Sequence, residues 1–191
     1  MKELNLIVAT TIDYGIGYQN DIPWNIPEEL KGFRKITTTV NNINKKNCVI
    51  MGKNTWFSLP NPPLKNRINI VISFNDYDIL SKTISKEDVI VLKSINDAIL
   101  YININANIEK GFIIGGSQLY NDFLDRYVQH ITYVYMSIII DNNYTCDKFI
   151  ASNIIFNNFK FEKENIHFTD KYITMCGENT NNYKIIDEPP D

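Results

Sequence analysis

Five short runs of almost continuous apolar residues, rich in β-branched side chains, constrain the fold of this chain most. They are "LNLIVA" (residues 4–9), "CVIM" (48–51), "INIVIS" (68–73), "VIVL" (89–92) and "GFIIG" (111–115). A strand that is apolar on both sides needs cover on both faces, which is typical of parallel sheets. Helical patterns separate the runs, at residues 27–39, 54–59, 95–105 and 117–124. This alternation predicts an α/β fold with right-handed crossovers.

The C-terminal part of the chain has a different character. "HITYVYMSIII" (130–140) predicts a long strand, and "KYITMCGENTNNYKIID" (171–187) predicts a hairpin whose turn lies at residues 179–182. The ending "DEPPD" is typical of a linker. We expect one domain over residues 1–191, in which 179–191 supply a turn, the last strand and a linker.

Bulk composition narrows the classes of function. The 191 residues suit one domain with a sizeable core, and a net charge of −3 with a pI of about 5.4 argues against nucleic-acid binding as the main role. The three cysteines and two histidines are widely separated, which favours a reducing compartment and offers no metal-binding pattern. The apolar runs are too short for a signal peptide or a membrane span. We therefore expect a soluble cytoplasmic protein.

Two adjacent glutamates open the first helical pattern, in "DIPWNIPEELKGF" (21–33). Glu29 falls inside the apolar stripe of this helix, whereas Glu28 points to roughly the opposite side. The stripe consists of Ile26, Leu30, Phe33, Ile36 and Val40. A carboxylate among apolar neighbours has a raised pKa and usually has a partner or a function. The helix alone leaves open that Glu29 lies at the edge of the stripe and reaches water.

Two junctions between a strand and a helix carry glycine. "FIIGGSQLY" ends a run at Gly115–Gly116, where Ser117 can cap the next helix, and "VIMGKNTWFSL" ends a run at Gly52, followed by Lys53. Glycine lets a ligand approach the backbone, and the first N–H groups of a helix suit a phosphate. Neither junction is a Rossmann or P-loop motif, and each alone also fits an ordinary turn. Together with a buried carboxylate, they indicate a dinucleotide-dependent enzyme.

Several motifs, in order and spacing, resemble the dihydrofolate reductase family from near the first residue to at least Phe149. They are "IVA", "GIG", "DIPW", "MGKNTW", "PLKNRINIVIS" and "IIGGSQLY". The resemblance implies a mixed, mostly parallel eight-stranded sheet flanked by helices, with a C-terminal antiparallel hairpin. It implies NADPH-dependent reduction of 7,8-dihydrofolate to 5,6,7,8-tetrahydrofolate, and binding of antifolate-type inhibitors. In some lineages the reductase is fused to thymidylate synthase, and that question stays open here.

The resemblance also implies roles for individual residues. Glu29 matches the acid that binds N3 and the 2-amino group of the pterin and favours protonation of N5 through ordered water, and Trp24 is its catalytic neighbour. Arg67 has the planar fork that suits the α-carboxylate of the glutamate tail. Ser137 matches the hydroxyl partner of the acid, with Thr132, or no hydroxyl at all, as the alternatives. The other implied substrate-binding residues are Ile7, Val8, Leu30, Phe33, Ser58, Leu59, Leu64 and Ile114.

For NADPH, the resemblance implies two phosphate-binding junctions and a nicotinamide site. Gly115–Gly116 matches the cis-peptide pair of the family, and residues 13–24 match its mobile loop. Lys53 and Ser73 match the groups that meet the 2′-phosphate, but Phe74 stands where a second basic residue often occurs, which leaves the strength of the NADPH preference open. The implied cofactor-binding residues are Ala9, Ile16, Gly17, Gly52, Lys53, Asn54, Thr55, Ser73, Ile114, Gly115, Gly116, Ser117, Gln118, Leu119 and Tyr120.

Two other functions remain as alternatives. A pyrimidine reductase of riboflavin synthesis shares the fold and the use of NADPH but lacks the pterin-binding acid, so Glu29 and Trp24 argue against it. A non-catalytic folate- or nucleotide-binding relative is disfavoured by Glu29, Arg67 and the two glycine junctions. Only a measurement of turnover excludes the second alternative.

Overall fold

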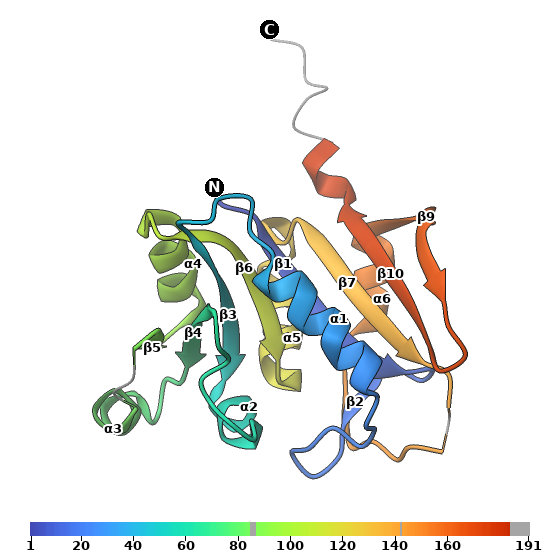
Figure 1. Ribbon diagram of the computed structural model, residues 1–191, viewed down its shortest axis with the longest axis horizontal. Coiled ribbons are helices and arrows are strands. Elements are labelled where there is room, and N and C mark those ends of the chain that lie inside the picture. The colour runs from blue at the N-terminus through green and yellow to red at the C-terminus, as the bar shows by residue number, and fades with distance from the viewer. Residues whose placement is uncertain (85–86, 142, 184–191) are drawn as a thin grey trace, which may run out of the picture.

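The structure, a computed structural model, describes residues 1–84, 87–141 and 143–183. These residues form an eight-stranded sheet in the order β5-β4-β3-β6-β1-β7-β10-β9, with helices on both faces (Figure 1). The strands of this sheet are β1 (Leu4–Thr11), β3 (Lys46–Gly52), β4 (Arg67–Ile72), β5 (Val89–Leu92), β6 (Ile108–Gly115), β7 (Tyr133–Ile139), β9 (Phe159–Phe168) and β10 (Tyr172–Asn179). A second, two-stranded sheet pairs β2 (Gly15–Gly17) with β8 (Lys148–Phe149).

The helices alternate with the strands in the first two thirds of the chain. They are α1 (Pro27–Thr38), α2 (Lys53–Ser58), α3 (Tyr77–Thr83), α4 (Ile95–Ile104), α5 (Ser117–Arg126) and α6 (Ser152–Asn158), with short 3₁₀ helices η1 (Val128–His130) and η2 (Thr180–Tyr183). All five apolar runs are strands, and β5, β4, β3, β6, β1 and β7 are joined as parallel neighbours. The antiparallel pairs β7–β10 and β10–β9 complete the sheet. The predicted α/β fold class is therefore confirmed.

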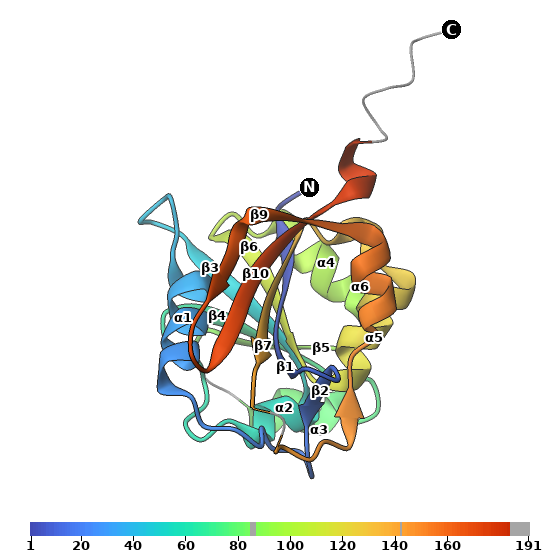
Figure 2. The ribbon, with the colours of Figure 1, turned by 90° about the vertical axis from the view of Figure 1, so that its right-hand side faces the viewer.

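The sheet separates two apolar layers, which explains why its strands are apolar on both sides. Along β3, Cys48 and Ile50 belong to the large core beneath α4, α5 and α6, whereas Val49 and Met51 belong to a smaller core that includes α1 and α2. Successive strand side chains point to opposite faces, so both sets must be apolar. Figure 2 shows α1 on one side of the sheet and α4, α5 and α6 on the other.

A C-terminal hairpin is present, but it is formed by β9 and β10. The predicted first arm is β10, and the strand predicted after the turn at 179–182 lies outside the described residues. The turn between β9 and β10 lies at Thr169–Lys171, where the Thr169 hydroxyl accepts from the Tyr172 N–H at 2.9 Å. Asn179 is fully buried and donates to the carbonyls of Val128 and Ile131 at 2.8 and 2.7 Å. It is thus a structural anchor at the end of β10. The expected linker, residues 187–191, lies outside the described residues.

The helices of the described part of the chain are too short or too polar to cross a membrane. The longest helix, α1, has 12 residues. A membrane-spanning helix needs about 20 predominantly apolar residues.

Candidate active site

Three junctions between a strand and a helix lie side by side at one edge of the main sheet. β3 is hydrogen-bonded to β4 on one side and to β6 on the other, so their carboxyl ends are neighbours. Gly52 ends β3, Ser73 follows β4, and Gly115 ends β6. In open α/β sheets, ligands bind outside the carboxyl ends of the strands. In Figure 1 this edge is the lower one, with α2 and α3 beneath it.

The two glycine junctions lie close together, and the Gly115–Gly116 junction leaves little room for a side chain. The Gly115–Gly116 peptide is cis, and Gly115 has a φ of +111°, in the region that favours glycine. A Cβ on Gly115 would lie 2.8 Å from the Tyr120 ring, and one on Gly116 would lie 3.2 Å from Thr55 Oγ1. A Cβ on Gly52 would lie 3.9 Å from the Gly115 carbonyl oxygen. This bare backbone surface fits a ligand that approaches the main chain closely.

The predicted cap of α5 was wrong. Ser117 is the first residue of α5, and the N-cap is Gly116, which makes no side-chain capping hydrogen bond. The first N–H groups of this ten-residue helix are therefore not capped by a side chain, which suits an anionic ligand. Along α5, Tyr120 is buried, and its hydroxyl donates to the Ile7 carbonyl at 2.8 Å.

The two glutamates of α1 have the environments that the helical pattern predicted. Glu28 is exposed and faces Lys171 at 3.6 Å; a hydrogen bond from its own backbone N–H and the charge of Lys171 lower its pKa. Glu29 is partly buried, and burial raises its pKa, while a hydrogen bond with the Ser137 side chain acts in the opposite direction. The expected contact between Glu29 and Ser137 is present. Thr132, the alternative, lies beyond the other end of β7.

The apolar stripe of α1 is narrower than expected. Leu30 is 51% exposed, and Val40 lies beyond the helix, which ends at Thr38. Phe33 and Ile36 pack into the smaller core as predicted. A polar residue, Thr37, is the fully buried side chain of this helix.

Glu29 and Ser137 line a cavity of about 240 Å³ between α1 and the strands β7 and β10. Ile7 and Phe33 also line it, and its far wall includes Thr174. On the same face of the sheet, predicted substrate-binding residues pack together in the smaller core; these are Ile7, Phe33, Leu59, Leu64 and Ile114. The carboxylate therefore lies at the border between a cavity and an apolar cluster, where it can bind a polar edge of an otherwise apolar ring.

Arg67 is buried at the start of β4, with 4% of its surface exposed. Its Nη1 donates to Thr37 Oγ1 at 2.8 Å, and its Nε donates to the Lys65 carbonyl at 3.1 Å. Its guanidinium also lies 5.9 Å from the centre of the Phe33 ring. Burial lowers its pKa to about 10, so it is still a cation at neutral pH. A fixed and partly desolvated guanidinium is well suited to bind a carboxylate.

The other predicted residues occupy varied positions. Trp24 is buried beside Ala9, with its ring edge-on to Tyr144 at 5.9 Å. Val8 packs into the large core on the opposite face from α1, so only its main chain can face the site. Exposed members are Leu30, Asn54, Ser58 and Gln118; partly buried members are Ala9, Ile16, Gly52, Lys53, Thr55, Leu59, Leu64, Ile114, Gly116 and Ser117; buried members are Gly17, Ser73, Gly115 and Leu119.

Sequence reasoning missed two polar partners of the site. Thr37 fixes Arg67 and in turn donates to the Phe33 carbonyl at 2.8 Å. Asp76 forms an ion pair with Lys53, with 2.7 Å between Nζ and Oδ2. Thr37 could have been noticed as a polar residue four positions after Phe33, on the inward side of α1. The Asp76–Lys53 pair joins residues 23 positions apart and has no signal in the sequence.

The mostly parallel sheet, the paired glycine junctions and the half-buried carboxylate define an α/β protein with a ligand site at the carboxyl ends of its strands. The family model for dihydrofolate reductase matches residues 3–179. The dihydrofolate reductase of Heliothis virescens is 31% identical over 171 residues, which cover 88% of this chain and 85% of that protein. That of Mus musculus is 37% identical over 132 residues, covering 66% and 68%. The chain belongs to the dihydrofolate reductase family.

Longer relatives match as well. Bifunctional dihydrofolate reductase-thymidylate synthase 2 of Arabidopsis thaliana is 35% identical over 155 residues. The match covers 77% of this chain but 26% of that protein. The chain therefore spans about a quarter of this bifunctional relative.

Proposed function

We propose that the chain reduces 7,8-dihydrofolate to 5,6,7,8-tetrahydrofolate with NADPH. The observation that carries the proposal is the half-buried carboxylate of Glu29, which contacts Ser137 beside the apolar cluster on the α1 face. When bound, NADPH would supply the hydride for C6 of the pterin; with a proton added at N5, the C6=N5 double bond would become a single bond. The residues of the chain bind, orient and shield the substrate.

Glu29 orients the pterin. Its carboxylate accepts hydrogen bonds from N3 and the 2-amino group, which present two donors side by side. Burial raises its pKa, and the hydrogen bond with the Ser137 side chain holds the orientation of the carboxylate. Glu29 favours protonation of N5 through ordered water.

The apolar cluster and Arg67 bind the rest of the substrate. Phe33, Leu59 and Leu64 enclose the pterin and the aminobenzoate and exclude water. Arg67 binds the α-carboxylate of the glutamate tail. The hydrogen bonds from Nη1 to Thr37 and from Nε to the Lys65 carbonyl fix the guanidinium, and Nη2 would meet the ligand.

The glycine junctions fit the coenzyme. A Cβ at Gly115 or Gly116 would meet Tyr120 or Thr55 at 2.8 or 3.2 Å, so glycine allows the close packing of this junction. The partly buried Gly52 and Gly116 leave main chain within reach of a ligand. The uncapped N–H groups of α5 suit a diphosphate. Trp24 and Ala9 lie together, where the nicotinamide would be shielded.

The test is a turnover assay with dihydrofolate and NADPH, comparing the wild type with Glu29→Ala and Glu28→Ala. We expect Glu29→Ala to lower kcat at neutral pH by about 10²-fold or more, with the smallest loss at acid pH. Glu28→Ala, a matched change on the exposed side of α1, should leave turnover near the wild-type value. Tight binding of NADPH and folate without turnover would indicate a non-catalytic relative. Failure to bind folate would make the pyrimidine of riboflavin synthesis the next substrate to assay.

The similarity to bifunctional relatives raises a second possibility for the full-length protein. We infer that a fusion to thymidylate synthase deserves a direct test, because the Arabidopsis thaliana relative combines both names in one chain. Sequencing the reading frame after Asp191 decides it. A stop codon at that point would refute the fusion.

A further inference from the structure

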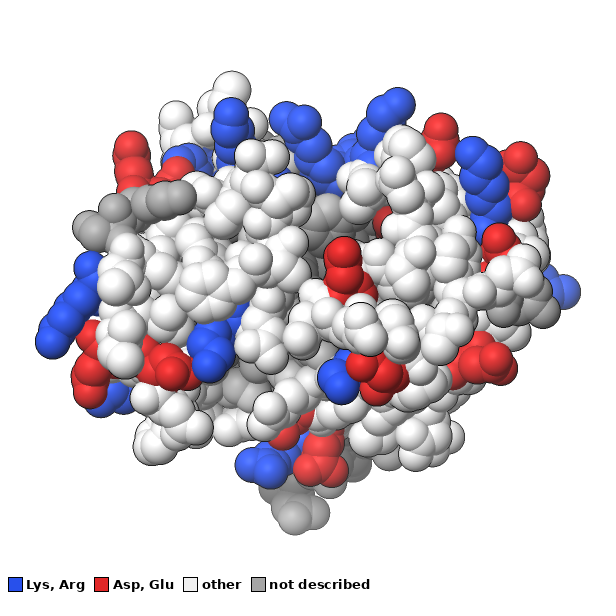
Figure 3. Space-filling view, turned by 90° about the horizontal axis from the view of Figure 1, so that it is seen from below, with Lys and Arg blue, Asp and Glu red and all other residues white. Residues whose placement is uncertain are grey.

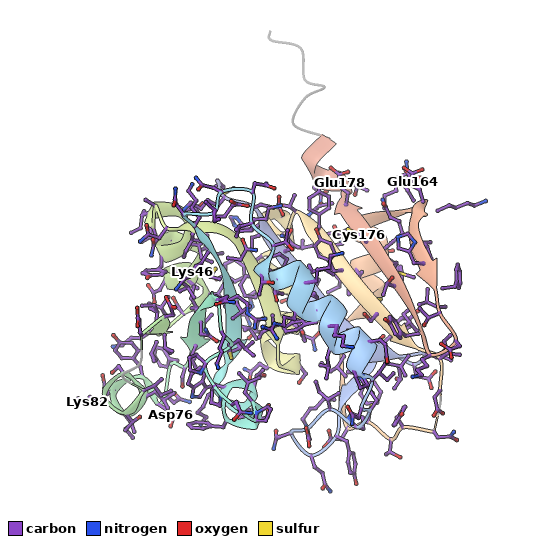
Figure 4. The ribbon with its side chains drawn as sticks, viewed as in Figure 1. Lys46, Asp76, Lys82, Glu164, Cys176 and Glu178 are labelled. Atoms are coloured by element: carbon purple, nitrogen blue, oxygen red, sulfur yellow. The ribbon has the colours of Figure 1, made fainter. Side chains whose placement is uncertain are left out.

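An acidic residue lies in the group of side chains that the resemblance assigns to the adenosine end of the coenzyme. Asp76 precedes α3, and Lys53 begins α2. Lys53 Nζ lies 2.7 Å from Asp76 Oδ2, and the Ser73 hydroxyl donates to the same oxygen at 3.3 Å. The Asp76 N–H donates back to Ser73 Oγ at 3.4 Å. Figure 4 shows Asp76 at the start of α3, on the side that faces α2.

This arrangement matters because Lys53 and Ser73 are the residues expected to meet the 2′-phosphate, the group that distinguishes NADPH from NADH. In dinucleotide-binding folds, an acidic residue that accepts from the ribose 2′-hydroxyl suits NADH, and a basic residue accommodates the 2′-phosphate. Here both kinds of residue are present, and they are bonded to each other.

The charges of Lys53 and Asp76 disfavour binding of the 2′-phosphate of NADPH. The hydrogen bond from Lys53 lowers the pKa of Asp76, so its carboxylate is ionised at neutral pH. The positive charge of Lys53 is thus already paired. A second cation near this junction, Lys93, follows β5 and has its Nζ over the Tyr77 ring, 4.7 Å from the ring centre. Phe74, which follows Ser73, is 77% exposed and apolar, so it adds no charge. Figure 3 shows acidic and basic side chains interspersed on this face of the molecule.

The carboxylate of Asp76 also has an oxygen that can accept a hydrogen bond from a ribose hydroxyl. Both side-chain contacts, from Lys53 and Ser73, end on Oδ2. Within the described residues, Oδ1 remains for a further donor. A ribose 2′-hydroxyl is a donor, whereas a phosphate carrying about −1.5 to −2 charges offers only acceptors.

We propose that Asp76 is a specificity-determining residue that reduces the preference of this chain for NADPH over NADH. It does so by occupying Lys53 and Ser73, by repelling the 2′-phosphate and by offering an acceptor to the free 2′-hydroxyl. The inference rests on the proposed function, because it assumes that these three residues meet the adenosine ribose.

The test measures the Kd of NADPH and of NADH, by quenching of protein fluorescence at low salt, for wild type, Asp76→Asn and Asp78→Asn. Asp76→Asn keeps the shape and removes the charge. Asp78→Asn makes the same charge change at an exposed position of α3. We expect Asp76→Asn to raise the ratio of NADPH to NADH affinity about tenfold, equivalent to about 1.4 kcal/mol. Asp78→Asn should change it less than about twofold.

The dependence of NADPH affinity on salt concentration is an independent test of the inference about Asp76. Because the effect is electrostatic and close to solvent, the difference between wild type and Asp76→Asn in NADPH affinity should shrink as ionic strength rises. An unchanged ratio in Asp76→Asn would overturn the inference. Weaker NADPH binding would also overturn it, because Asp76 would then be orienting Lys53 toward the phosphate.

The proposed function can fail separately. If wild type turns over dihydrofolate with NADPH and Asp76→Asn leaves the affinity ratio unchanged, only the inference about Asp76 is wrong. If wild type binds neither coenzyme, the proposed function fails and the inference fails with it.

Discussion

The hydrogen bond between Ser137 and Glu29 opposes the effect of burial on the pKa of the proposed catalytic carboxyl, and Ser137→Ala measures its contribution. A hydrogen bond to a charged group contributes about 1.5–3 kcal/mol, and the partial exposure of Glu29 favours the lower value. Removing the hydroxyl should therefore raise the pKa of Glu29, in the same direction as burial, and destabilise the folded protein with ionised Glu29 by about 1.5 kcal/mol.

The assay follows the carboxyl ¹³C signal of Glu29 against pH, with Glu29→Gln to assign it. Ser137→Thr is the matched control, because it keeps the hydroxyl and adds one methyl group beside a cavity of about 240 Å³. We expect a higher midpoint in Ser137→Ala and a midpoint close to that of the wild type in Ser137→Thr. A midpoint that stays or falls in Ser137→Ala would refute the reasoning.

Ser137→Ala should also lower the stability of the folded protein, by an amount that depends on pH. Burial raises the pKa of Glu29 in the folded state, so its contribution is complete below the unfolded pKa and is lost as pH rises through the folded pKa. Ser137→Ala raises the folded pKa further, so the loss continues to higher pH. At neutral pH the variant should melt about 3–6 °C lower, and at acid pH the difference should become small.

Three further changes test other parts of the structure. Arg67→Ala should weaken dihydrofolate binding about tenfold or more, while a pterin without the glutamate tail binds nearly as well as before; equal losses for both ligands would contradict the assigned role. Gly115→Ala puts a methyl group 2.8 Å from the Tyr120 ring at a φ of +111°, so coenzyme affinity should fall and unfolding should become easier by about 1–3 kcal/mol, as measured in urea. Phe123→Ala empties a fully buried site and should cost about 3–5 kcal/mol, lowering Tm by about 6–20 °C; a smaller shift would mean that the core beneath α5 collapses into the gap.

Much of the fold could be predicted because its elements are locally encoded. The five apolar runs became strands, since a strand covered on both faces must be apolar at successive positions. The phase of α1 was also predictable, because 3.6-residue periodicity alone separates Glu28 from Glu29. The cis Gly115–Gly116 peptide followed from the family resemblance and is present.

The parts that escaped prediction depend on contacts that are distant in sequence. Asn179 resembles a turn residue, but tertiary packing buries it against the carbonyls of Val128 and Ile131. Strand β9 has charged residues along much of its length, so it carries no apolar run. Asp76 meets Lys53 only because β3 and β4 are neighbours, and a pattern within one segment cannot report such a pair.

The hydroxyl of Tyr120 links the two halves of the proposed reaction. Tyr120 belongs to α5, the helix that follows the Gly115–Gly116 junction, and its hydroxyl donates to the carbonyl of Ile7 in β1. Ile7 and Glu29 line the same cavity. This buried hydrogen bond ties β1, beside the proposed substrate site, to α5, beside the proposed coenzyme site. Reacting groups must be held in a defined geometry for efficient transfer. We therefore expect a change at Tyr120 to disturb the alignment of the two sites with each other.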